Sequence, residues 1–127
     1  MKLQFLKAAL LATALAGGLA APALAHHGWS WTETGFFQLE GIVKAVYLGN
    51  PHATIDLDVE GTVWRVELAP PGPTTAAGFV EGAVKAGDEI TAIGNRSVDH
   101  NETRMKAVRI VFGDKTFDVY PDRAKQI

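Results

Sequence analysis

The stretch from residue 53 to residue 68 limits the fold more than any other part of the sequence. Apolar and polar residues alternate from 53 to 59 and again from 62 to 68, and Glu60 and Gly61 separate the two runs. Alternation with a period of two is typical of a half-buried strand, and a tight turn joins two such strands into an antiparallel hairpin. The side chains predicted to face the core are Ala53, Ile55, Leu57, Val59, Trp64, Val66 and Leu68.

Four further segments are predicted to be strands, at residues 37–47, 90–94, 104–112 and 116–120. Residues 48–52 (Leu-Gly-Asn-Pro-His) have the composition of a turn, because proline cannot donate to a central ladder. Thr74 and Thr75 predict a short helix that runs to about Val84, weakened by Gly78 and Gly82. In the first strand, the alternation places on one face Phe37, Leu39, Gly41, Val43, Ala45 and Tyr47.

The order of these elements predicts the fold class. A long strand, a hairpin, a helix and then two or three strands is the arrangement of the oligonucleotide/oligosaccharide-binding (OB) barrel. The sequence therefore predicts an all-β protein, a five- to six-stranded OB-like barrel over residues 37–120. Residues 26–36 are predicted to be an N-terminal lead-in whose aromatic residues pack on the barrel, and residues 121–127 a frayed C-terminal tail.

The first 25 residues are predicted to be a cleaved signal peptide. Lys2 and Lys7 precede an acid-free run rich in Ala and Leu, which ends in small residues. A positive start, an apolar middle and an A-x-A ending are typical of a secretory signal. The alternative is a membrane anchor, but Gly17-Gly18 and Pro22 interrupt the run. We therefore expect a periplasmic or secreted protein with no transmembrane segment after cleavage, which follows either Ala25 or Ala23.

Composition excludes several classes of function. The chain of 127 residues has no cysteine, so disulfides, cysteine nucleophiles and thiolate metal sites are excluded. Its formal charge of −2 gives no basic excess for binding nucleic acid. The only serines, Ser30 and Ser97, lie in no nucleophile motif, and no phosphate-binding loop or H-E-x-x-H motif occurs. We therefore find no catalytic signature and expect a binding protein, not an enzyme.

Histidines are the remaining candidates for metal binding. Cleavage after Ala25 would make His26 the first residue, so that an amine and an imidazole could chelate one metal ion. A second imidazole would complete a three-nitrogen site suited to copper. Adjacent residues of an extended chain point to opposite sides, which disfavours His27 as the partner of His26 and favours His52. The predicted metal ligands are therefore His26 and His52, with His27 as the weaker candidate.

Two alternatives remain open for the N-terminal histidines. Cleavage after Ala23 would make His26 the third residue, and the amine, two backbone nitrogens and the imidazole would then form a square-planar site for Cu(II) or Ni(II). Otherwise, His26 and His27 help signal processing or pack with Trp29. His52 alone is typical of a turn histidine bonded to backbone, and His100 of a solvated loop.

The aromatic residues allow two interpretations, and the acidic residues of the hairpin are expected to be surface residues. Six aromatic residues would line a ligand-stacking face or, as we prefer, pack in the core and lead-in. The carboxylates of residues 56, 58, 60 and 67 are expected on the solvated outer face of the hairpin, with Arg65 offsetting their repulsion. The six aromatic residues are Trp29, Trp31, Phe36, Phe37, Tyr47 and Trp64.

Five short motifs in a fixed order suggest a family. They are His26-His27-Gly28-Trp29, Leu39-Glu40-Gly41-Ile42-Val43, Asn50-Pro51-His52, Trp64-Arg65-Val66-Glu67-Leu68 and Gly87-Asp88-Glu89-Ile90-Thr91. This set resembles the bacterial exported family known as domain of unknown function 6152, and the match covers the chain to about Tyr120. The resemblance implies a small exported OB-like domain. It implies no activity, so no catalytic residue is transferred.

Three functions are compatible with these observations. The first is an exported binding module of unknown physiological role that holds copper through the mature N-terminal histidine. The second is a structural or interaction module without metal, which docks on a protein partner in the cell envelope. The third is an OB domain that binds a saccharide or another small molecule.

Overall fold

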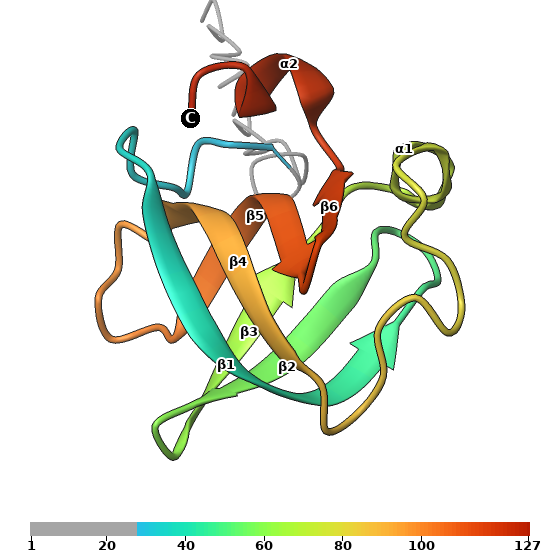
Figure 1. Ribbon diagram of the computed structural model, residues 1–127. Helices are drawn as coiled ribbons and strands as arrows, with labels where there is room; N and C mark the ends of the chain where they lie inside the picture. The colour runs from blue at the N-terminus through green and yellow to red at the C-terminus, as the bar shows by residue number, and fades with distance from the viewer. Residues whose placement is uncertain (1–27) are drawn as a thin grey trace, which may run out of the picture.

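The computed structural model describes residues 28–127, which form a small barrel of β-strands with two short helices (Figure 1). The predicted signal peptide and the histidines at positions 26 and 27 lie outside the described residues. The elements in chain order are β1 (Phe37–Tyr47), β2 (Thr54–Val59), β3 (Thr62–Glu67), α1 (Pro71–Ala76), β4 (Glu89–Arg96), β5 (Arg104–Phe112), β6 (Lys115–Asp118) and α2 (Pro121–Ala124).

The long strand β1 and one parallel pairing close the barrel. The first half of β1 pairs with β4 and its second half with β2, both antiparallel. β2 continues into β3 through the predicted hairpin, and β4 pairs with β5. Parallel pairing of β3 with β5, from Arg65↔Arg104 to Glu67↔Lys106, completes the circle, and β6 adds to the outer edge of β5. This is the predicted OB-like barrel.

A β-bulge in β1 changes which side chains face the core. The register with β2 shifts between Val43 and Ala45, so the extra residue reverses the inward and outward positions that follow. Val43 is buried, whereas Ala45 and Tyr47 are exposed and Val46 packs against the core. The prediction that Ala45 and Tyr47 share the inward face was wrong, because uninterrupted alternation cannot register a bulge.

The connection between β3 and β4 also differs from the prediction. The helix occupies Pro71–Ala76 instead of residues 74–84. Proline suits the first helical turn, where its missing N–H costs nothing, so the helix starts inside the proline run. The helix ends near Gly78, whose φ of +85° is in the left-handed region. Thr74 lies inside the helix, and its hydroxyl donates to the Ala69 carbonyl at 2.8 Å.

The barrel interior holds one apolar core. Six of the seven predicted inward residues of the hairpin are buried, and the seventh, Val59, is partly buried against the core. Trp64 contacts Phe37 with 5.9 Å between ring centroids. Side chains from β5 fill the barrel from the other side. The largest fully buried side chains are Phe79, Ile55, Leu57, Leu68, Ile90, Met105 and Ile110. The core of this domain therefore forms without disulfides.

The lead-in and the C-terminal helix meet at one end of the barrel, opposite the β2–β3 turn (Figure 1). Trp29 packs edge-on against Tyr120 at 4.9 Å between centroids. The expectation of a frayed tail was wrong for its first part, because residues 121–124 form α2 and Ala124 is buried. Neither helix in residues 28–127 has the length and apolar character needed to cross a membrane.

Candidate functional site

A buried carboxylate on the outside of the barrel organises the candidate site. Glu67 ends β3 and is only 8% exposed, although its side chain points away from the core. Arg104 Nη2 donates to both of its carboxylate oxygens, at 2.9 and 3.0 Å, and His52 Nε2 lies 3.1 Å from Oε1. We call these three side chains the Glu67 network. An opposite charge and several hydrogen bonds stabilise the carboxylate where water is largely excluded.

Backbone pairing fixes His52 beside Glu67. Residue 52 lies in the loop between β1 and β2, and the next residue, Ala53, exchanges hydrogen bonds with Leu68 and Ala69 just beyond β3, at 2.8 and 3.0 Å. The loop is therefore bound at its end to the chain that follows Glu67. This pairing explains why an imidazole from the first loop meets a carboxylate from the third strand.

Lys106 connects the Glu67 network to the N-terminal lead-in. It is directly opposite Glu67 in the parallel β3–β5 pairing, and its Nζ donates to the Gly28 carbonyl at 3.1 Å. The Trp29 ring lies 4.6 Å from the same Nζ and 3.7 Å from the Arg123 guanidinium carbon. Cation–π contacts and a hydrogen bond therefore hold the lead-in on β5 and α2.

Burial at this end of the barrel shifts the pKa values of two side chains, Lys106 and Tyr120. It lowers the pKa of Lys106, while Glu67 acts in the opposite direction and Arg123 and Arg104 lower it further. Burial also raises the pKa of Tyr120. Both shifts have the same physical cause, which is that a charged form loses hydration under the lead-in. The lead-in thus covers a partly dehydrated polar surface.

An open pocket of about 380 Å³ lies beside the Glu67 network on the outer face of β2 and β3. The β1–β2 loop forms one wall with Pro51 and His52, and Tyr47 contributes from the end of β1. Asp56 and Arg65 form an ion pair across the floor, with Nε and Oδ1 2.6 Å apart. This is the face that OB barrels use for ligands, together with the loop between the first two strands.

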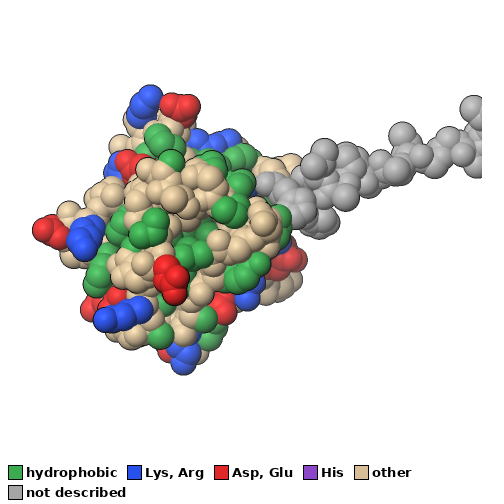
Figure 2. Space-filling model, turned by 90° about the vertical axis from the view of Figure 1, so that its right-hand side faces the viewer, with side chains coloured by type: hydrophobic (Ala, Val, Ile, Leu, Met, Phe, Trp, Pro, Cys, Tyr) green, Lys and Arg blue, Asp and Glu red, His purple; other side chains and the backbone are tan. Residues whose placement is uncertain are grey.

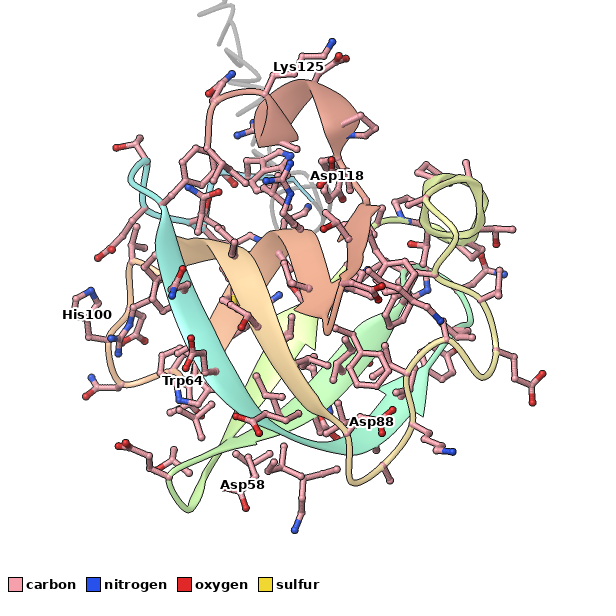
Figure 3. All side chains as sticks on the ribbon, in the orientation of Figure 1. Asp58, Trp64, Asp88, His100, Asp118 and Lys125 are labelled. Carbon is pink, nitrogen blue, oxygen red and sulfur yellow. The ribbon has the colours of Figure 1, made fainter. Side chains whose placement is uncertain are left out.

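The predicted histidines have different places in the molecule. His52 lines the pocket and contacts Glu67. His26 and His27 lie outside the described residues, so the predicted copper site is described only at His52. His100, on the β4–β5 loop, pairs with Glu33 of the lead-in, on the side of the barrel away from the β1–β2 loop (Figures 1 and 3). Within residues 28–127, no three His, Asp or Glu side chains gather closely enough to hold a metal ion.

The sequence did not predict the roles of three residues of the site. Glu67 was expected on a solvated face, but His52 and Arg104 cover it. Arg104 and Lys106 begin β5 and were assigned no role. Their alternation with Met105 and Ala107, which are buried, would have placed both outside the barrel. Only the β3–β5 pairing brings them to Glu67, and no local pattern predicts that pairing.

The strand order and the position of the pocket define this domain as an OB-type barrel. A solved structure supports this class. In a search of solved structures, the S. pombe Stn1-ten1 complex matches with a TM-score of 0.50 and 14% sequence identity, over 72% of this chain and 63% of that chain. At this identity the likeness shows the fold alone, and the chain spans less than two thirds of the protein that it matches.

The sequence also places the chain in a family. It belongs to the family described as "Family of unknown function (DUF6152)", whose sequence model matches residues 14–106. This result confirms the resemblance drawn from the five ordered motifs. No curated protein sequence matches the chain. The established description is therefore a small β-barrel module of a family without an assigned role.

Proposed function

We propose that this protein is an exported OB-type module that binds a copper ion through its mature N-terminal histidine, His26, and through His52. The observation that carries the proposal is the 3.1 Å hydrogen bond from Lys106 Nζ to the Gly28 carbonyl. It holds the chain two residues after His26 against the strand beside Glu67. Two extended residues span at most about 7 Å, so a chain that started at His26 would have its amine within reach of this end of the barrel.

The surroundings of His52 suit a metal ligand. A metal-binding histidine usually engages a carboxylate or carbonyl with its other ring nitrogen, which fixes the orientation of the ring. In His52, Nε2 contacts the Glu67 carboxylate, and Arg104 in turn donates a hydrogen bond to Glu67. His52 thus has a supporting partner of the kind that ligands need.

The donor types favour copper. A terminal amine, the imidazole of His26 and the imidazole of His52 would supply three nitrogen ligands. Nitrogen donors bind Cu(II) more tightly than the other divalent metals of the first row. Calcium and magnesium prefer sets of oxygen ligands instead. Because we propose that the protein is exported, it would acquire copper outside the cytoplasm, in the periplasm or after secretion.

Native mass spectrometry of the exported protein tests this function. The mass without metal identifies the first residue as His26 or Leu24, and one equivalent of Cu(II) should give a tight 1:1 adduct. The adduct should be lost in His26→Ala and in His52→Ala. It should persist in His100→Ala, the matched control, because His100 pairs with Glu33 far from the pocket.

Two other results would contradict the proposal. An adduct that survives His52→Ala but not His26→Ala would indicate a square-planar site at the N-terminus alone, as expected for a Leu24 start. If no adduct forms in the wild-type protein, the protein does not bind copper, and an interaction module with a partner in the cell envelope becomes the better explanation.

A further inference from the structure

We propose that the pocket on the outer face of β2 and β3 binds a neutral saccharide, which stacks on Tyr47 and is hydrogen-bonded by Asp56 and Arg65. This inference does not rest on the copper site. It rests on three observations about the pocket: a fixed, exposed aromatic ring, a half-exposed ion pair on the floor, and a guanidinium partner for each carboxylate of the lining.

Tyr47 lines the pocket with an aromatic ring whose position is fixed before any ligand binds. The bulge in β1 turns it outward, and it is 52% exposed. Its hydroxyl donates to the Asn50 carbonyl at 2.8 Å, which ties the ring to the loop. A Cβ on Gly49 would lie 2.3 Å from that hydroxyl, so only glycine leaves room for this position. A rigid tyrosine presents a large contact area at a low entropic cost, which suits stacking on the C–H face of a sugar.

The ion pair on the floor offers hydrogen bonds in both directions. Arg65 uses Nε for Asp56 Oδ1, and the two side chains are 53% and 33% exposed. A guanidinium carries five N–H donors and a carboxylate accepts at two oxygens, so this single contact uses only part of the pair's hydrogen-bonding capacity. Neighbouring hydroxyl groups, each a donor and an acceptor, are the groups that such a pair recognises.

The balance of charge argues for a neutral ligand. Each of the two carboxylates of the lining has a guanidinium partner: Asp56 pairs with Arg65, which also lines the pocket, and Glu67 pairs with Arg104, which lies outside the lining. An ionic ligand would meet no surplus of opposite charge. The volume of about 380 Å³ lies within the usual range for small-molecule sites, and it would hold roughly one or two sugar rings.

Protein NMR can test this proposal without knowledge of the natural ligand. The metal-free, isotope-labelled protein is titrated separately with cellobiose, maltose and N,N′-diacetylchitobiose. We expect at least one of them to shift the amide signals of Tyr47, Thr54, Asp56 and Arg65 in a saturable manner. If none of the three shifts these signals, or if sodium sulfate shifts them instead, the proposal of a neutral saccharide is wrong.

Variants separate this site from the copper site and from general unfolding. Tyr47→Ala and Arg65→Ala should each weaken binding of the sugar by about tenfold or more while the spectrum stays that of a folded protein. Ile42→Ala changes an exposed residue in the middle of β1 that does not line the pocket, and it should leave binding unchanged. Both pocket variants should still load copper. Equal sugar binding in Tyr47→Ala, Arg65→Ala and Ile42→Ala would overturn the proposal.

Discussion

Glu67 is an outward-facing strand residue that is nevertheless buried. Its carboxylate receives two hydrogen bonds from Arg104 and contacts His52, and the side chain of Arg104 is itself only 25% exposed. Hydrogen bonds between charged groups contribute more than neutral ones when water is largely excluded. This carboxylate therefore joins the β1–β2 loop, β3 and β5, and it does so at the wall of the pocket.

We predict that Glu67→Gln lowers the free energy of unfolding by about 2 kcal/mol, because Arg104 loses its charged partner. Urea unfolding followed by circular dichroism measures this change. The control is Glu40→Gln on the exposed side of β1, where a change within about 0.5 kcal/mol is expected. A similar small effect in both variants would mean that the Glu67 network adds little to stability.

The buried ammonium of Lys106 predicts a dependence of stability on pH. Burial lowers its pKa in the folded protein, with Glu67, Arg104, Arg123 and the ring of Tyr120 around it. The unfolded chain therefore holds this proton up to a higher pH than the folded protein does. The contribution of Lys106 to stability therefore rises with pH in the range below the ordinary lysine value of 10.5, because the unfolded state holds this proton more often there.

The measurement compares the wild type with Lys106→Met, which keeps an unbranched chain and removes the charge. Urea unfolding of both proteins at neutral pH and at about pH 10 gives the difference in unfolding free energy. We expect this difference to shift in favour of the wild type at the higher pH. A difference that stays constant, or that moves the other way, would show that burial does not disfavour the ammonium.

The lead-in and α2 form one packing unit, although almost the whole barrel separates them in sequence. Trp29 joins them, since it contacts Tyr120 edge-on and lies 3.7 Å from the guanidinium carbon of Arg123. Each element is too short to be stable by itself. Their order therefore depends on the contact between them and on Lys106 beneath.

We predict that Trp29→Ala loosens both elements and lowers the free energy of unfolding by about 1–2 kcal/mol. Hydrogen exchange should become faster at the amides of residues 28–33 and 121–127, and should stay unchanged in β2 and β3. The comparison is Trp31→Ala, which removes the stacking on Arg104 and should not accelerate exchange in α2. If hydrogen exchange in α2 is unchanged in Trp29→Ala, the lead-in and α2 do not depend on each other for their order.

The elements that were predictable from the sequence are those governed by local patterns. The hairpin of β2 and β3 follows from strict alternation and a Glu-Gly turn, and all its predicted inward residues are buried except Val59, which is partly buried. The helix α1 was misplaced because a proline run reads as a strand terminator, whereas Pro71 starts a helical turn. The bulge in β1 was missed because it depends on pairing with β2 and not on composition.

The site was less predictable because barrel closure creates it. His52 was identified by its residue type, but its partners come from β3 and β5, and these strands pair only when the barrel closes. Glu67, Arg104 and Lys106 each belong to an ordinary outward position when a single strand is considered. The charges of the site also do not gather in one part of the sequence. On the face in Figure 2, acidic and basic side chains are likewise interspersed instead of forming a patch of one sign.

Closure of the barrel depends on a close approach between β4 and β5 at Gly94. A Cβ at this position would lie 2.1 Å from the Lys106 carbonyl oxygen and 2.8 Å from the Ala107 Cα, both of which are backbone atoms. The register of the two strands shifts between Ile93 and Gly94, which bends the sheet here. Backbone atoms cannot rotate away, so any larger residue must separate the strands.

We predict that Gly94→Ala lowers the free energy of unfolding by about 3 kcal/mol or more, because β4 and β5 can no longer pair at this distance. Since Lys106 lies at the same contact, the variant should also loosen the lead-in and weaken the proposed copper site. The control is Gly72→Ala in α1, where no atom lies within 4 Å of the added Cβ and stability should be unchanged or slightly higher. Thermal unfolding followed by circular dichroism measures both variants. If Gly94→Ala melts at the wild-type temperature, the barrel tolerates a wider spacing of β4 and β5 than this contact implies. The end of the barrel at the lead-in would then not depend on tight closure.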